Sequence, residues 1–294
     1  MNIEIDNRPP DWFVKALDSP CYSRKFPYAD TELHFLEWGD PKNPPLIFIH
    51  GGAAHARWWQ FLAPFFAEHY HCLAPDLSGH GDSGHRELYP RTAWADELAA
   101  LCKYTLTQPP ILVGHSMGGL VAVVAAAEHP DQFKAICVID SPIRKPDPES
   151  QARMTPPTLP QAKVYAEWEH ALSRFRLLPA QPCENQFIVD FLARTSLKEV
   201  EGGWTWKFDP MVFAKHSIIP MHEYLARVQL PTVLLRGAYS TIVPPDVFAY
   251  MAELTQGRAP LIEIPEAHHH LILDQPLAFV AALRSILASA PFKA

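Results

Sequence analysis

Long apolar runs and clusters of basic residues are both missing from this chain of 294 residues. No stretch approaches the roughly 18 apolar residues of a membrane-spanning helix. Residues 1–10 are polar and have neither the basic start nor the apolar centre of a secretory signal. The net charge is -7 and charged residues make up 19%, which does not favour nucleic acid or an anionic membrane as a partner. We therefore expect a soluble, cytoplasmic protein whose partner is a small molecule.

Cysteine is also scarce, and the five cysteines are widely scattered, mostly among apolar residues. An odd number without paired spacing predicts neither a disulfide framework nor a zinc motif, but reduced thiols in the core. The chain has no internal repeat and no low-complexity segment. Its length suits one α/β domain with an insertion. The five positions are Cys21, Cys72, Cys102, Cys137 and Cys183.

The rest of the chain is organised around one stretch, residues 111–120, where an apolar run leads into Gly-His-Ser-Met-Gly and an Ala/Val-rich segment. This order predicts a buried strand, a tight turn and a buried helix. Gly114 and Gly118 fit because the backbone before and after Ser116 would come too close for a Cβ at either place. Ser116 is then exposed at the tip as a nucleophile. The helix starting at Met117 directs free N–H groups at an oxyanion formed beside Ser116.

Strands and helices alternate on both sides of this stretch, which predicts an α/β fold with a mostly parallel central sheet flanked by helices. The first two strands read as a hairpin at an antiparallel edge of the sheet. The expected strands are 22–26, 32–38, 46–49, 71–77, 111–115, 133–139, 232–236 and 261–264, and the expected helices are 58–68, 91–106, 117–128, 245–255 and 277–288.

The alternation stops between residues 142 and 228, where prolines, aromatic residues and helical patterns without strands take over. We interpret this segment as an inserted helical cap between two core parts, residues 1–141 and 229–294. Its aromatic side chains either form a small core of the cap or line a pocket over Ser116.

The sequence His-Gly-Gly-Ala-Ala at residues 50–54 follows a buried strand. If this loop lies beside Ser116, the N–H of Gly52 or of Ala53 can pair with that of Met117 as an oxyanion hole. We expect His50 to brace the loop. In the later turn Ser-Gly-His-Gly-Asp-Ser-Gly, we interpret Asp76, His80 and Asp82 as loop-building residues and not as metal ligands.

The order of these motifs resembles that of capped members of the α/β-hydrolase superfamily. The resemblance covers nearly the whole chain and implies the α/β-hydrolase fold, with Ser116 as nucleophile, Gly52 and Met117 as oxyanion donors and His269 as general base. His269 is preferred within the run of three histidines because it has the family's usual distance to Pro276. No cofactor or metal is expected, because consecutive residues in an extended loop point in different directions.

The orienting acid departs from the family pattern. The usual place lies a few residues beyond Gly237, yet residues 237–244 contain no carboxylate, and Asp246 falls too late. Some members of the superfamily carry the acid after the preceding strand, which ends here at Asp140. Asp140 either orients His269 or serves only as a hydrogen-bonding residue at the hinge of the cap.

These assignments predict a serine hydrolase acting on a small apolar carboxylic ester through a Ser-His-(Asp) acyl-enzyme mechanism. Two alternatives stay open. One is a ligand-binding, receptor-like homologue with weak or no turnover, and the other is a C–C bond hydrolase using the same serine and histidine. The oligomeric state carries no signature in the sequence.

Overall fold

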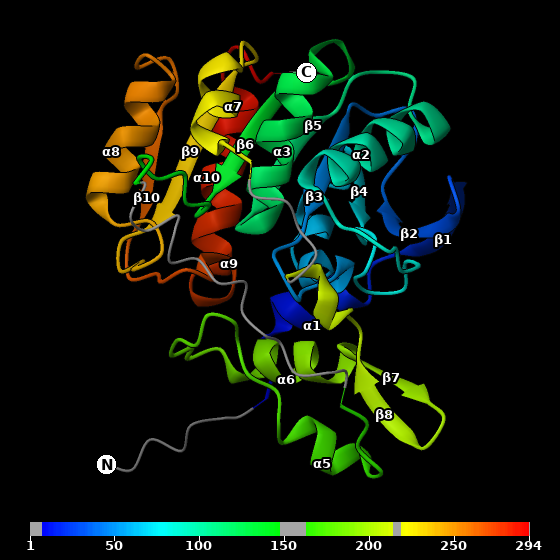
Figure 1. Ribbon diagram of the computed structural model, residues 1–294. Helices are drawn as coiled ribbons and strands as arrows, with labels where there is room; N and C mark the ends of the chain where they lie inside the picture. Colours follow the sequence, from blue (N-terminus) through cyan, green and yellow to red (C-terminus); the bar gives the residue numbers. More distant parts are fainter. Residues whose placement is uncertain (1–7, 148–162, 214–218, 294) are drawn as a thin grey trace, which may run out of the picture.

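The computed structural model of the protein describes residues 8–147, 163–213 and 219–293. An eight-stranded sheet forms its centre (Figure 1), in the order β1-β2-β4-β3-β5-β6-β9-β10. Strand β2 is antiparallel to β1 and β4, and every other pair is parallel, which confirms the predicted antiparallel edge. The strands are β1 (Tyr22–Tyr28), β2 (Thr31–Trp38), β3 (Pro45–Ile49), β4 (His71–Pro75), β5 (Ile111–His115), β6 (Ala135–Ile139), β9 (Thr232–Gly237) and β10 (Leu261–Ile264).

Both faces of the sheet are covered, which explains why its central strands are continuously apolar. Along β3, Leu46 and Phe48 belong to one hydrophobic cluster, while Ile47 and Ile49 belong to the other. Helices α1 (Asp11–Leu17) and α10 (Pro276–Ala288) contribute to the first cluster, and α2 (Arg91–Thr105), α3 (Met117–Glu128), α7 (Met221–Arg227) and α8 (Pro245–Leu254) contribute to the second. No helix in the described ranges has the length and apolarity to cross a membrane.

The helix predicted over residues 58–68 is wrong. The chain forms two short 3₁₀ turns there, η1 (Ala56–Trp59) and η2 (Ala63–Phe65). Pro64 explains the break, because it has no N–H to donate within a helix and its ring would collide with the carbonyl of the preceding turn. Most apolar side chains of this stretch are buried, whereas Phe65 and Ala67 are partly exposed.

The expectation that residues 142–228 contain no strands is also wrong. A two-stranded hairpin, β7 (Leu197–Val200) and β8 (Gly203–Trp206), turns at Gly202 and Gly203, whose φ values are +85° and +136°. The other elements of the 163–213 segment are α5 (Trp168–Leu172), α6 (Gln186–Thr195) and the 3₁₀ turn η4 (Pro210–Val212). Figure 1 shows α5, α6, β7 and β8 together on one side of the sheet. Helix α7 instead packs against α3 and α8.

Candidate active site

Ser116 lies between the end of β5 and the start of α3, and its backbone has a φ of +55°. This left-handed conformation is strained for a residue with a side chain. A Cβ at Gly114 would lie 2.4 Å from the carbonyl oxygen of Gly118, and a Cβ at Gly118 would lie 2.4 Å from that of Ile49. The predicted need for glycine is confirmed at both places, but at Gly118 the close neighbours are the carbonyls of Ile49 and His50 and not the backbone before Ser116. Ser116 itself is partly exposed, so its hydroxyl is within reach of a ligand.

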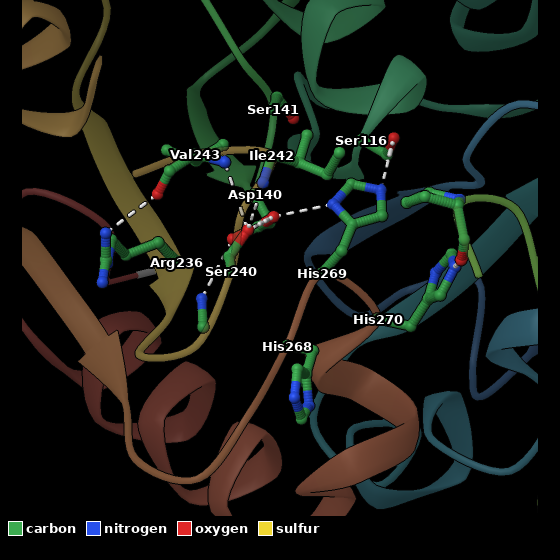
Figure 2. A network of polar contacts seen from close by, with 12 residues as sticks. Ser116, Asp140, Ser141, Arg236, Ser240, Ile242, Val243, His268, His269 and His270 are labelled. Carbon is green, nitrogen blue, oxygen red and sulfur yellow. Dashed lines mark hydrogen bonds and ion pairs between the residues drawn. The ribbon is translucent and has the colours of Figure 1, made fainter. Parts of the chain in front are cut away.

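His269 and Asp140 complete a hydrogen-bonded chain that begins at Ser116 (Figure 2). The distance from Ser116 Oγ to His269 Nε2 is 3.0 Å, and that from His269 Nδ1 to Asp140 Oδ2 is 2.7 Å. Since a carboxylate can only accept, Nδ1 carries the proton and Nε2 is left to accept from the serine hydroxyl. Asp140 is fully buried and His269 is 3% exposed. Water therefore competes little for these hydrogen bonds.

The loop after β9, where the acid was expected and is absent, instead supplies hydrogen-bond donors to Asp140. The backbone N–H of Gly237 donates to Asp140 Oδ1 over 3.0 Å, and Ser240 Oγ donates to Oδ2 over 2.6 Å. Ser240 was not singled out in the sequence. The signal for it was its position, since it stands among the residues beyond Gly237 where the family usually carries its acid.

The two neighbours of His269 are held away from Ser116. The backbone N–H of His268 donates to Asp274 Oδ2 over 2.7 Å, and the ring of His268 lies 3.4 Å from the same oxygen. The backbone N–H of His270 donates to Gln181 Oε1 over 2.8 Å. Figure 2 shows both rings turned away from Asp140. Of the three consecutive histidines, His269 is the one that bonds to both Ser116 and Asp140 among the described residues.

His115 was also not anticipated. Its Nε2 lies 2.9 Å from the carbonyl oxygen of His269, and burial lowers its pKa well below the ordinary value. Burial likewise lowers the pKa of His270 to about 3, so both rings are neutral beside His269 at pH 7.

Among the described residues, two groups of side chains have the composition of a metal site. The first consists of His115, His269 and His270, each with one ring nitrogen within 4.8 Å of the others. Both nitrogens of His269 already have partners in Ser116 and Asp140, so this ring would have to give up its hydrogen bond to Ser116 to bind an ion.

The second group is His34, Asp76 and Asp82. The carboxylate of Asp76 accepts from the backbone N–H groups of Ala56 and Asp82 over 2.6 and 2.8 Å and contacts His34 Nδ1 over 2.6 Å. Asp76 thus builds the loop, as predicted, and its oxygens are occupied. His50 braces the neighbouring loop, because its Nε2 accepts from the N–H of Leu77 and its Nδ1 donates to Gly51 O over 2.7 Å.

The loop that contains Gly52 passes beside the nucleophile. A Cβ built at Gly51 would lie 3.3 Å from Ser116 Cβ, and one built at Gly52 would lie 3.8 Å from Met117 Sδ. Neither the N–H of Gly52 nor that of Met117 donates to an acceptor within the described part of the chain. The same holds for the N–H of Ala53, so either loop residue can join Met117 as a donor to an oxyanion next to Ser116.

A cavity of about 300 Å³ lies between this loop and the 163–213 segment. Gly52 and Ala53 belong to its mostly apolar lining, whereas Ser116 and His269 do not. The aromatic residues of the segment have three roles, one of which is to pack on the core, as Phe187 and Phe191 do against Phe13 of α1. Tyr165, Phe175, Trp206 and Phe208 line the cavity, whereas Trp168 and Trp204 pack edge to face at 4.5 Å within the segment.

The arrangement can also be compared with known proteins. A family model described as the alpha/beta hydrolase family matches residues 46–283. The chain belongs to this family. It is 28% identical over 258 residues to the sn-1-specific diacylglycerol lipase ABHD11 of Mus musculus, a match that covers 85% of the chain and 83% of that relative. It is also 28% identical over 255 residues to a pimeloyl-(acyl-carrier protein) methyl ester esterase of Chromobacterium violaceum, covering 82% of the chain and 93% of the relative.

Solved structures agree with this α/β-hydrolase membership. An E-2-(acetamidomethylene)succinate hydrolase superposes with a TM-score of 0.78 at 22% identity, covering 92% of the chain and all of that structure. At this identity the likeness concerns the fold alone. The resemblance drawn from the motifs is confirmed, as is the predicted fold, and the protein is a hydrolase.

Proposed function

We propose that this α/β-hydrolase is a serine hydrolase of small, mainly apolar carboxylic esters. The proposal depends above all on the hydrogen bonds that link three side chains. Asp140 Oδ2 lies 2.7 Å from His269 Nδ1, and His269 Nε2 lies 3.0 Å from Ser116 Oγ. A serine hydroxyl that donates to a neutral imidazole, itself oriented by a buried carboxylate, is the arrangement that activates a serine toward carbonyl carbon.

In the first half of the reaction, Ser116 Oγ attacks the ester carbonyl carbon while His269 Nε2 takes the hydroxyl proton. The oxyanion accepts hydrogen bonds from the N–H groups of Gly52 and Met117, and Asp140 stabilises the imidazolium. The bond to the alcohol oxygen then breaks, and His269 gives its proton to that oxygen. In the second half, water attacks the acyl-enzyme, loses a proton to His269 and releases the carboxylic acid, while the proton returns to Ser116.

The same proposal assigns residues 142–228 as a cap and residues 1–141 and 229–294 as the core, with α7 at the end of the cap range packed against α3 and α8 of the core. The cavity beside Gly52 supports this division, since its mostly apolar lining comes largely from the 163–213 segment. All five cysteines are free, and three of them are buried. This state fits a reducing compartment, and we retain the cytoplasm as the proposed location.

Two relatives are a diacylglycerol lipase and a methyl ester esterase, which supports an ester as substrate. The ligand-binding alternative depended on a missing acid, and Asp140 now stands at hydrogen-bond distance from His269. A C–C bond hydrolase uses the same serine and histidine and differs only in its substrate, so it is a distinct outcome of the experiment below.

The test is the rate of hydrolysis of 4-nitrophenyl esters of increasing acyl length, measured with the native protein and with Ser116→Ala. We expect turnover by the native protein and a loss of roughly 10⁶-fold in kcat in the variant. Circular dichroism controls for folding. Labelling by a fluorophosphonate, mapped to Ser116 by mass spectrometry, reports the nucleophile independently of the substrate. Labelling without ester turnover would point to a C–C substrate, and turnover that survives Ser116→Ala would reject the mechanism.

A further inference from the structure

The cavity beside Gly52 has an unbalanced charge. Four basic residues line it, and no carboxylate is among the described residues that do. The whole chain, in contrast, carries a net charge of -7. The basic residues are Lys163, Arg174, Arg176 and Lys207. A positive patch of this kind raises the local concentration of anionic ligands.

Three of the four basic side chains have no carboxylate partner within the described ranges. Lys207 is the exception, because its Nζ lies 2.7 Å from Asp82 Oδ1. Arg174 Nε donates weakly to the ring of His170 over 3.4 Å, and Arg176 Nη1 donates to the carbonyl oxygens of Ser173 and Phe175. Neutral acceptors leave the charge of each guanidinium uncompensated, and further N–H groups remain for an anionic oxygen.

Lys163 is the third of these side chains. Its Nζ lies 5.8 Å from the centre of the Tyr165 ring, which is also part of the lining. Contact with a ring face leaves an ammonium its charge and its donors. Lys163, Arg174 and Arg176 are all exposed on the protein surface, so they stand at the mouth of the cavity and not in its floor.

A buried donor in the same cavity also lacks a partner. Trp58 lines the cavity and is 5% exposed, and its indole Nε1–H donates to no acceptor among the described residues. Buried N–H groups are nearly always paired, and this one can donate to a water molecule or to a ligand oxygen in the cavity. His55 beside it does not add charge, because burial lowers its pKa to about 3.

The position of the cavity relative to Ser116 suggests how a substrate lies. The Gly51–Gly52 loop touches Ser116 on one side and borders the cavity on the other. The ring of Phe213 covers one side of Gly52, because two of its atoms lie 2.8 Å from the place of a Cβ there. An ester whose carbonyl stands at Ser116 would therefore reach the basic side chains past Ala53 and the ring of Phe213.

We infer that the preferred substrate is an ester with an apolar chain that ends in an anionic oxygen group, a carboxylate or a phosphate, bound by Lys163, Arg174 and Arg176. This inference builds on the proposed ester hydrolysis and narrows it. Arginine pairs with either group through two parallel N–H bonds. Because the three cations are exposed, the preference depends on ionic strength.

The experiment compares matched 4-nitrophenyl esters that differ only at the far end of the chain. The neutral series is hexanoate and octanoate, and the carboxylate series is the hemiesters of adipate and suberate. Analogues ending in a phosphate monoester complete the set and identify which anion is preferred. We expect kcat/KM for an anionic ester to exceed that for the neutral ester of the same chain length by about tenfold at low salt. In 0.5 M NaCl the ratio of the two kcat/KM values should fall toward one.

A double variant, Arg174→Gln with Arg176→Gln, should lower the ratio of anionic to neutral kcat/KM by about tenfold, mainly through KM. Arg194→Gln is the matched control, since its guanidinium pairs with Asp190 outside the cavity and its loss should leave the ratio unchanged. The inference would be overturned if the native protein gave an anionic-to-neutral ratio of kcat/KM near one at every ionic strength. It would also be overturned if Arg194→Gln lowered this ratio as much as the double variant, and neither result would contradict ester hydrolysis.

Calorimetric titration of Ser116→Ala with suberate monomethyl ester and with dimethyl suberate tests the inference without turnover. Tighter binding of the anionic compound, weakened by the double arginine variant, would support it. Equal affinity would reject it. If the native protein hydrolyses no ester of any charge, the proposed function fails, and the titration still decides whether this cavity selects anions.

Discussion

Ser240 donates a 2.6 Å hydrogen bond to the same oxygen of Asp140 that accepts from His269. The two residues come from different strands, since Asp140 follows β6 and Ser240 follows β9. Ser240 Oγ also accepts from the backbone N–H of Val243 over 3.2 Å. The hydroxyl therefore connects the loop after β9 to the proposed catalytic acid and holds its carboxylate in one orientation.

Removing this hydroxyl should slow the reaction without removing any proposed catalytic group. We expect Ser240→Ala to lower kcat about tenfold, because a hydrogen bond to a charged group contributes about 1.5 kcal/mol or more, with KM little changed. Steady-state kinetics on one ester checks this. Ser240→Thr retains the hydroxyl and should recover most of the rate. An equal loss of kcat in Ser240→Ala and Ser240→Thr would show that Ser240 acts through packing and not through its hydrogen bond.

In Asp140→Asn the side chain keeps its shape but no longer carries a negative charge. An amide at this place can donate to His269 Nδ1 and so favour the wrong tautomer, and we expect kcat to fall by about 10⁴-fold near neutral pH. The measurement is kcat from pH 6 to pH 10, with the melting temperature as a control for folding. A rate close to that of the native protein would limit Asp140 to a structural role.

Replacing His268 or His269 should have very different effects on activity. His269→Ala removes the proposed base, and we expect a loss near that of Ser116→Ala, about 10⁶-fold in kcat. His268→Ala should retain most of the activity, because the backbone N–H that holds Asp274 is unaffected. If kinetics with the same ester instead gave the larger loss for His268→Ala, the assignment of the base would have to change.

The close backbone contacts at the nucleophile turn predict a stability effect. In Gly118→Ala the new Cβ would stand 2.4 Å from Ile49 O and 2.5 Å from His50 O, and neither carbonyl can move without disturbing β3. We expect a loss of at least about 3 kcal/mol in the free energy of unfolding by urea. Gly257→Ala is the comparison, since its Cβ meets no atom within 4 Å and its φ of +70° alone should cost roughly 1 kcal/mol.

A buried carboxyl on α2 should make stability depend on pH. Burial raises the pKa of Glu97 from its ordinary 4.5 to about 7, against the opposing effect of its hydrogen bond from Ser78 N–H. Below pH 4.5 the group is protonated in both the folded and the unfolded chain, and above pH 7 it is ionised in both. Its favourable contribution is thus complete below pH 4.5 and is lost as the pH rises to about 7.

Urea unfolding of the native protein and of Glu97→Gln at several pH values measures this contribution. The native protein should lose about 3 kcal/mol relative to the variant between pH 4.5 and pH 8, which corresponds to the shift in the pKa of Glu97. Glu68→Gln, a change at an exposed carboxyl, controls for net charge. Parallel curves for the native protein and Glu97→Gln would contradict the predicted burial penalty.

Much of the site was predictable because its signals are local. The turn around Ser116 depends on glycines two residues before and after it, and the alternation of apolar strands and helices marks the sheet. The roles of His269 and Asp140 could be predicted only from the resemblance to the family, because residues 116, 140 and 269 come together only in the folded chain.

What the sequence did not reveal depends on contacts between distant segments. Ser240 acquires its role from Asp140, which is 100 residues away, and His115 acquires its role from the backbone of His269. The hairpin β7–β8 was missed although Gly202 and Gly203 mark its turn, because the surrounding prolines and aromatic residues were interpreted as helical. The basic lining of the cavity combines side chains spread over residues 163–207, which no short motif joins.

The proposed reacting groups and the residues that line the cavity lie in different parts of the chain, which affects how such a protein can acquire new specificities. The polar chain from Ser240 to Ser116 is built entirely from residues outside the 163–213 segment, whereas nearly all the basic and aromatic residues around the cavity lie within it. Replacing that segment with one of different composition that keeps Gln181, which accepts from the N–H of His270, would exchange the proposed specificity and leave the proposed reacting groups in place. Selectivity and chemistry can thus be inherited, recombined and engineered as separate units.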